Sequence, residues 1–162
     1  MAKWRLPMFK LSQRSFQRLV GVHPDLVETV KLAIKKSDTD FGVIYGVRDL
    51  ATQEKLYKSG KSQTMKSKHL VQEDGYSHAV DLMAYDSGEP SWDIVDYDNI
   101  ADAMKAAALE TGAKICWGAA WQIDDITKWD GTMEQAMNAY IDLRRSQSRR
   151  PFIDGPHFQL TT

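Results

Sequence analysis

The chain has 162 residues, 43% of them hydrophobic, and carries 21 Lys and Arg against 22 Asp and Glu. This length suffices for one domain with a packed core, which we expect to cover residues 1–162. The nearly balanced charge excludes the global positive field that is typical of nucleic-acid-binding proteins. The single cysteine, Cys116, excludes an intramolecular disulfide, and its apolar neighbours favour a buried structural thiol.

The first residues, Met1–Pro7, carry charge but lack the apolar run of a secretion signal. No stretch of the chain approaches the ~18 apolar residues that a membrane-spanning helix needs. We therefore expect a protein that is made in the cytosol and does not insert stably into a membrane.

The first half of the chain predicts mainly helices. Ser12 is a good N-cap for a short helix, and Pro24 suits the first turn of a second helix. The apolar residues of that second helix recur at a spacing of three and four. A strand is predicted at 41–45 and a third helix at 50–58.

The second half predicts short strands separated by long connections. Strand character is found at 79–83, 115–117 and 158–160, and helices are predicted at 98–110 and 133–144. Helices first, then strands with long connections, favour an α+β fold with a small antiparallel sheet and flanking helices.

Four polar residues suggest a catalytic metal site. His69, Asp81 and His157 form a three-ligand set that suits zinc, and Asp154 lies three residues before His157. A catalytic zinc site needs three protein ligands, an open position and a nearby base. The Gly155-Pro156 turn can bring the Asp154 carboxylate beside the metal, where it would act first as a general base and then as an acid.

The choice of the first histidine depends on strand geometry. His78 precedes Asp81 by three residues, and an odd offset in a strand places two side chains on opposite faces. An aspartate between Val80 and Leu82 needs a partner if it is buried. His69 lies beyond a polar loop and can fold back beside Asp81, so we predict His69 as the ligand and retain His78 as the alternative.

Several aromatic residues are candidates for lining a substrate cleft. Trp121, Tyr76 and Tyr85 have apolar rings with a polar group that can contact a peptide or a sugar. Trp117 lies in a short apolar run, which favours core packing over a place in the cleft.

Three short segments resemble a known enzyme family. Ser67-Lys68-His69, His78-Ala79-Val80-Asp81-Leu82 and Asp154-Gly155-Pro156-His157-Phe158 are similar to the zinc D-Ala-D-Ala carboxypeptidase and L-alanyl-D-glutamate peptidase family. They most closely resemble its bacteriophage endolysins. The resemblance implies the hedgehog/D,D-peptidase fold and a single zinc peptidase catalytic domain, without a separate cell-wall-binding domain.

The resemblance also implies a role for each site residue. His69, Asp81 and His157 correspond to the ligands of Zn²⁺, and Asp154 corresponds to the catalytic acid and base. Arg48 lies in a segment similar to the family's arginine-bearing turn. It would therefore orient the substrate or stabilise the oxyanion, a role that suits its fixed charge.

The sequence departs from the family pattern at three places. The segment 71–77 is longer than usual, which keeps His78 as an alternative ligand. Ala120 stands where many relatives have an acid, so a regulatory calcium site is doubtful despite the nearby Asp124-Asp125. Gln159 stands where many relatives have Glu, which removes a charge near His157.

The implied function is hydrolysis of peptidoglycan stem peptides, at the L-alanyl-D-glutamate bond, by an endolysin. We expect a monomer that stays in the host cytoplasm until a holin releases it to the periplasm and cell wall, and that has no nucleic-acid partner. One alternative is a D-alanyl-D-alanine carboxypeptidase or dipeptidase, which the absence of a secretion signal disfavours. The other is a non-catalytic hedgehog-like zinc-binding module, which Asp154 and Arg48 disfavour.

Overall fold

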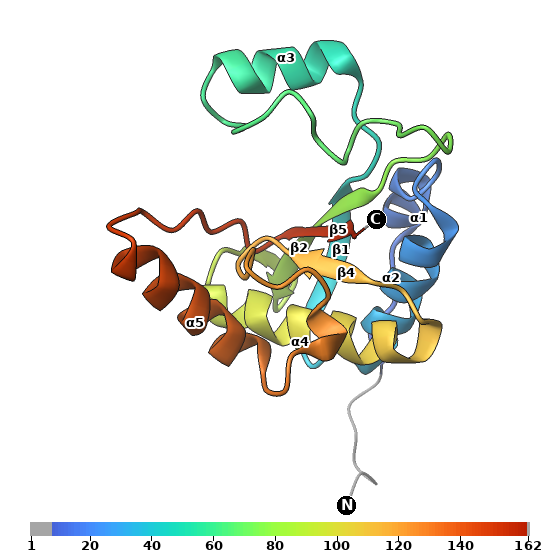
Figure 1. Cartoon of the computed structure of the whole chain (residues 1–162). Coiled ribbons are helices and arrows are strands. Elements are labelled where there is room, and N and C mark those ends of the chain that lie inside the picture. Colours follow the sequence, from blue (N-terminus) through green and yellow to red (C-terminus); the bar gives the residue numbers. More distant parts are fainter. Residues whose placement is uncertain (1–7, 162) are drawn as a thin grey trace, which may run out of the picture.

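A computed structural model describes residues 8–161; the N-terminal segment in which the sequence predicts no secretion signal lies outside this range. Figure 1 shows a small sheet with helices on one side and a single helix standing apart on the other. The helices are α1 (Gln13–Arg18), α2 (Pro24–Lys36), α3 (Leu50–Lys58), α4 (Ile94–Thr111), the short 3₁₀ helix η2 (Ile126–Lys128) and α5 (Met133–Ser146). The strands are β1 (Asp40–Tyr45), β2 (Ala79–Asp86), β3 (Glu89–Ser91), β4 (Ile115–Trp117) and β5 (His157–Leu160).

The sheet is antiparallel, with strand order β1-β2-β5-β4, and β3 pairs with β2. The central pair is therefore β2 and β5, although about 70 residues separate them in the chain. Their register places Ala79 opposite Gln159, Val80 opposite Phe158 and Asp81 opposite His157. This pairing brings two distant polar residues side by side.

The two faces of the sheet differ in chemistry because side chains alternate along each strand. Val80, Leu82, Phe158 and Leu160 face the apolar core that the sheet shares with the helices. Asp81, His157 and Gln159 lie on the other face. One face of the central strands thus supports the fold, and the other carries the polar residues.

The helical layer rests mainly on α4, which contacts α2, α5, β2 and β4. Its alanines allow close packing, and its end is set by Gly112 in the left-handed conformation. By contrast, within residues 8–161 α3 packs against no other helix or strand over an extended area. The segment 48–68, which we call the α3 arm, therefore depends on local contacts for its position. Among the described helices, none is long and apolar enough to cross a membrane.

The predicted α+β architecture, with a small antiparallel sheet and flanking helices, is confirmed. Ser12 caps α1 as predicted, since its side chain accepts a hydrogen bond from the Ser15 N–H. Several elements differ: β3 and η2 were not predicted, β2 continues to Asp86 rather than ending at 83, and α4 begins at Ile94 rather than at 98. The turn at Ser87-Gly88, where both residues have positive φ, returns the chain to pair β3 with β2, and Asp93 caps α4.

Candidate metal centre

The register of β2 and β5 forms the first half of the site. Because Asp81 and His157 stand opposite each other, Asp81 Oδ1 lies 3.2 Å from His157 Nδ1. The other ring nitrogen of His157, Nε2, lies 2.8 Å from Gln159 Oε1, two residues along the same face. The amide oxygen of Gln159 can only accept, so Nε2 carries a proton, and in the neutral ring Nδ1 presents its lone pair to Asp81.

The second half of the site comes from the loop before β2. The His69 side chain is 2% exposed, and its Nε2 lies 3.2 Å from Asp81 Oδ2. Its Nδ1 lies 2.8 Å from the Gly46 carbonyl oxygen, which again can only accept a proton. The backbone is held as well: the His69 N–H donates to Ser67 Oγ, and the Arg48 N–H donates to the His69 carbonyl oxygen.

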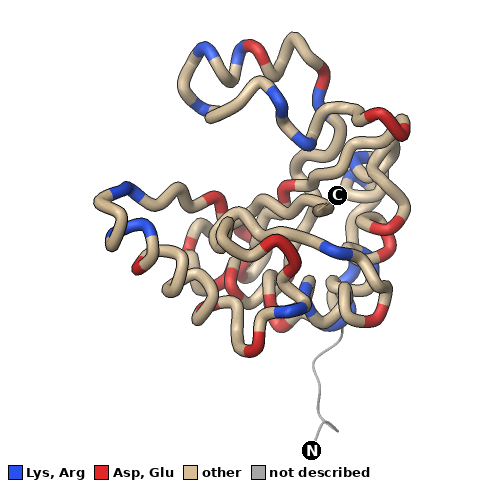
Figure 2. Tube along the Cα trace, in the orientation of Figure 1, with Lys and Arg blue, Asp and Glu red and all other residues tan. Residues whose placement is uncertain are grey.

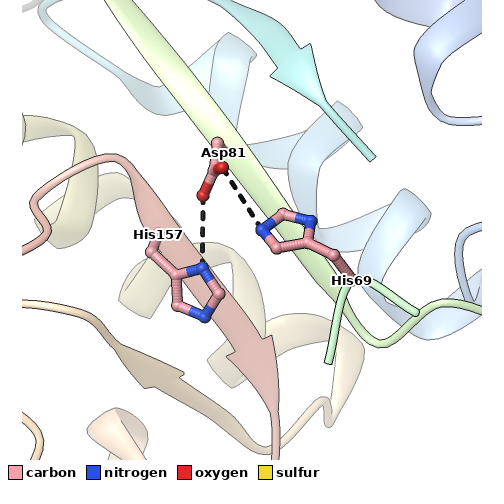
Figure 3. A group of neighbouring side chains, drawn as sticks. All are labelled: His69, Asp81 and His157. Carbon is pink, nitrogen blue, oxygen red and sulfur yellow. Dashed lines mark hydrogen bonds and ion pairs between the residues drawn. The ribbon is translucent and has the colours of Figure 1, made fainter. Parts of the chain in front are cut away.

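Figure 3 shows His69 Nε2 and His157 Nδ1 turned toward the same carboxylate. In the neutral tautomers that Gly46 and Gln159 select, these two nitrogens carry no proton. The three donor atoms all lie within 4.8 Å of one another, and His69 Nε2 is a buried nitrogen without a hydrogen-bond partner. Three electron-rich atoms facing one another repel unless a cation lies between them. Two imidazole nitrogens and a carboxylate oxygen are the donor types that zinc binds. His69, Asp81 and His157 thus fit a metal ion.

Asp81 remains ionised in this cluster. Burial alone would raise the pKa of its carboxyl group, but the adjacent imidazole groups of His157 and His69 hold the pKa well below its usual range. Arg48 adds to this environment, since its Nη2 lies 3.8 Å from Asp81 Oδ2.

Arg48 is itself held by a buried glutamine. Its Nη1 donates to Gln53 Oε1 at 2.8 Å, and the side chain of Gln53 is fully buried within the α3 arm. The amide of Gln53 donates to Ser62 Oγ and to the Thr64 carbonyl oxygen. One side chain thus connects Arg48 to the loop that follows α3.

Asp154 reaches the site through a tight turn that Gly118 permits. The Asp154 N–H donates to the Gly118 carbonyl oxygen, and the Gly118 N–H donates to the His157 carbonyl oxygen, both at 2.8 Å. A side chain at Gly118 would collide with the Asp154 backbone and with His157 Cβ. Burial raises the pKa of Asp154 and the Asp81 charge raises it further, partly offset by His157, His69 and Arg48.

These groups share an open cleft of about 670 Å³ between the α3 arm and the polar face of the sheet. His69, Asp81, His157, Asp154 and Arg48 all line it. The site therefore combines a candidate metal cluster, a carboxyl group and a guanidinium group around one space that is large enough for a peptide.

Comparisons with known proteins agree with this arrangement. The family described as phage L-alanyl-D-glutamate peptidase matches residues 7–161. The chain belongs to this family. It is 29% identical over 117 residues to the L-alanyl-D-glutamate peptidase of Escherichia phage T5, covering 70% of this chain and 82% of that one. The crystal structure of a Serratia marcescens L-Ala D-Glu endopeptidase matches with a TM-score of 0.68 and 32% identity, covering 99% of this chain and 96% of the other.

In this family member, the alternative ligand His78 lies outside the cluster. Its Nε2 is 2.7 Å from Asp74 Oδ2, and its ring packs edge-on against His23. His78 instead anchors the loop through its backbone, donating to the Lys68 carbonyl oxygen and accepting from the Leu160 N–H. The long segment 71–77 therefore folds away from the polar face and returns the chain at β2.

Of the aromatic residues predicted as candidates for the cleft, some line it and others do not. Trp121 lines the cleft, together with Phe152, which the sequence did not single out. Trp117 is fully buried in the core and donates to the Gly155 carbonyl oxygen, while Tyr76 and Tyr85 lie outside the cleft. The local sequence of Phe152, beside a basic stretch, carries no sign of a site residue.

Within residues 8–161, no cluster of metal ligands forms at Asp124-Asp125, where some relatives bind a regulatory calcium ion. The His69, Asp81 and His157 group is the only set of three potential metal ligands found in this range. Asp125 caps η2, and the backbone oxygen of Asp124 accepts from Thr161. Both residues serve local structure.

Proposed function

We propose that this protein is a zinc-dependent peptidase that hydrolyses the L-alanyl-D-glutamate bond of peptidoglycan stem peptides. The observation that carries the proposal is the pair of histidine ring nitrogens that face the Asp81 carboxylate in an open cleft. Membership of the phage L-alanyl-D-glutamate peptidase family supports the choice of bond.

His69, Asp81 and His157 would hold the ion. When bound, zinc supplies Lewis-acid chemistry, which makes water more acidic and polarises a carbonyl group. The remaining tasks fall to this chain's own side chains. They must move a proton, stabilise negative charge and hold the stem peptide in place.

Asp154 is the group that moves the proton. In hydrolysis the C–N bond breaks, the alanyl carbonyl carbon gains a hydroxyl from water, and the D-glutamate nitrogen gains a proton. Asp154 would accept the proton from water and give it to the departing amine. A pKa raised by burial suits the second step, because the protonated carboxyl group persists closer to neutral pH.

Arg48 supplies fixed positive charge beside the cluster. Its guanidinium group is held by Gln53 on one side and lies near Asp81 on the other, so it is oriented before substrate binds. We assign it to orienting the substrate carbonyl or stabilising the oxyanion.

In its biological setting, we propose that the protein is a monomeric phage endolysin. It would remain in the host cytoplasm until a holin opens the path to the periplasm and cell wall. Its partner is peptidoglycan, and the phage origin of the family supports the assignment.

Digestion of purified Gram-negative sacculi, followed by mass spectrometry of the released muropeptides, tests the proposed reaction. We expect zinc-loaded protein to release stem peptides that begin with D-glutamate, and we expect chelation to abolish the release. Release of terminal D-alanine alone, from stem peptides that stay attached, would instead identify a D,D-carboxypeptidase. Zinc binding without any product would identify a non-catalytic module.

A further inference from the structure

We propose that Lys61, Lys66 and Lys68 form a subsite for the free α-carboxylate of the D-glutamate residue that follows the scissile bond. We call these three residues the lysine wall. The inference rests on the proposed function, because it assigns a part of that same substrate to one wall of the same cleft.

The charge of the cleft differs from that of the chain. Over the whole chain, cations and carboxylates nearly cancel, at 21 to 22. Among the residues that line the cleft, Lys and Arg outnumber Asp and Glu by four to three, even before a divalent metal is counted; they are Arg48, Lys61, Lys66 and Lys68 against Asp49, Asp81 and Asp154. Positive charge concentrated in a concave site attracts anionic ligands.

The three lysines are available to a ligand. Within residues 8–161, none of them forms an ion pair with a carboxylate, whereas Arg48 lies near Asp81. Figure 2 shows Lys and Arg along α3 and along the chain that follows it, on the side of the gap opposite the sheet. The lysine wall thus offers three uncompensated charges to the cleft.

The loop that carries these lysines is anchored at two points. The buried Gln53 side chain donates to Ser62 Oγ at 2.9 Å and to the Thr64 carbonyl oxygen, which fixes the loop between Lys61 and Lys66. Lys68 directly precedes His69, whose backbone is held by Ser67 and Arg48. Hydrogen bonds therefore hold the backbone that carries the three lysines along the cleft.

In the substrate, negative charge likewise lies on only one side of the scissile bond. In an L-alanyl-D-glutamate unit, the carbon bound to the scissile nitrogen carries the free α-carboxylate of D-glutamate, while the alanyl side carries a methyl group and no charge. The cleft wall formed by Trp121 and Phe152 is likewise uncharged. A charged wall and an uncharged wall fit a peptide whose negative charge lies on one side of the bond.

Two matched substrates test the subsite. They are muramoyl tripeptides that differ only at the α-carboxyl group of D-glutamate, which is free in one and amidated in the other. The variants are the triple substitution Lys61→Gln, Lys66→Gln, Lys68→Gln and a control, Lys55→Gln with Lys58→Gln. Lys55 and Lys58 belong to α3 but do not line the cleft. The single variant Lys66→Gln, at an exposed position, repeats the test with the smallest structural change.

We expect the wild-type protein to cleave the free acid with a kcat/KM about tenfold higher than the amide, since each partly exposed charge pair contributes only a few-fold. The triple variant should lose this preference while retaining its rate on the amide, and the control should keep it. Equal cleavage of both substrates by the wild type, or an equal loss on both in the triple variant, would overturn the subsite. Cleavage of neither substrate would contradict the proposed function, and the subsite with it.

Discussion

Gln159 and His157 lie on the same face of β5, and their side chains meet at 2.8 Å. This contact assigns the proton of His157 to Nε2 and directs the lone pair of Nδ1 to the metal cluster. Residues that orient a metal ligand in this way commonly change metal affinity ten- to a hundredfold, as a rough range, when they are removed. The first prediction follows from this relationship.

Gln159→Leu should weaken zinc binding about tenfold, because His157 loses the acceptor that fixes its ring and its tautomer. Competition with a chelating dye measures the affinity directly and needs no substrate. Gln147→Leu, at the exposed end of α5, is the control. Unchanged affinity in the Gln159 variant would contradict the assigned orientation.

The ligand set predicts opposite results for two neighbouring histidines. His69→Ala should abolish stoichiometric zinc binding, because it removes one of the three donor atoms. His78→Ala should retain the metal, since its ring pairs with Asp74 instead. Metal content after gel filtration distinguishes the two. Loss of zinc only in the His78 variant would show that the wrong histidine has been assigned.

Asp154→Asn should keep zinc bound and lower kcat by about 10²- to 10⁴-fold, because the amide cannot carry the proton from water to the amine. Muropeptide release at saturating substrate gives kcat, and metal analysis gives the zinc content. Asp142→Asn, on the exposed side of α5, serves as the control. Full activity in the Asp154 variant would rule out the proposed acid and base.

Substitutions of Arg48 and Gln53 should have non-additive effects on kcat/KM, because Gln53 holds the Arg48 side chain. Gln53→Met keeps the volume but removes the acceptor for Arg48, and we expect kcat/KM to fall about tenfold. In an Arg48→Ala background the same change should matter less than about twofold. The amidated tripeptide is the substrate of choice, since it does not engage the lysine wall.

The neighbouring exposed residue in α3 provides the control for this cycle, as Glu54→Met should leave both backgrounds unchanged. Additive losses from Arg48→Ala and Gln53→Met would mean that Gln53 acts only on the structure of the α3 arm and not through Arg48.

Asp98 predicts a pH dependence of stability away from the site. This α4 residue is 5% exposed, and burial, with the charges of Glu134 and Asp102, raises its pKa to about 6. Because the folded state binds this proton more tightly than the unfolded chain, the stabilising contribution is complete below pH ~4 and is lost as the pH rises through ~6.

Asp98→Asn should therefore raise the free energy of unfolding at pH 7.5 by about 1 kcal/mol, a value discounted for solvent screening. The difference from wild type should disappear near pH 4. Urea unfolding of both proteins at the two pH values measures it, and Glu54→Gln, at an exposed position, is the control. A difference that does not change with pH would contradict the prediction.

The sequence by itself determined on which face of its strand each site residue in the sheet lies. Alternation along a strand separates Asp81 from Val80 and Leu82, and His157 from Phe158, whatever the strands pair with. The N-caps and the amphipathic pattern of α2 are local in the same sense, so most elements could be predicted. The strand β3 could not, because three residues bounded by a turn have no periodicity to read.

The tertiary structure determined which residues, distant in the sequence, lie next to each other. The register that sets Asp81 opposite His157 pairs residues that are 76 positions apart in the chain, and no local pattern specifies it. His69 faces Asp81 because Gly46 and Arg48 hold its ring and backbone, while Asp74 holds His78 elsewhere. Gln53 and the lysine wall are ordinary polar residues in the sequence. They acquire a role only where long-range hydrogen bonds and burial place them at the cleft.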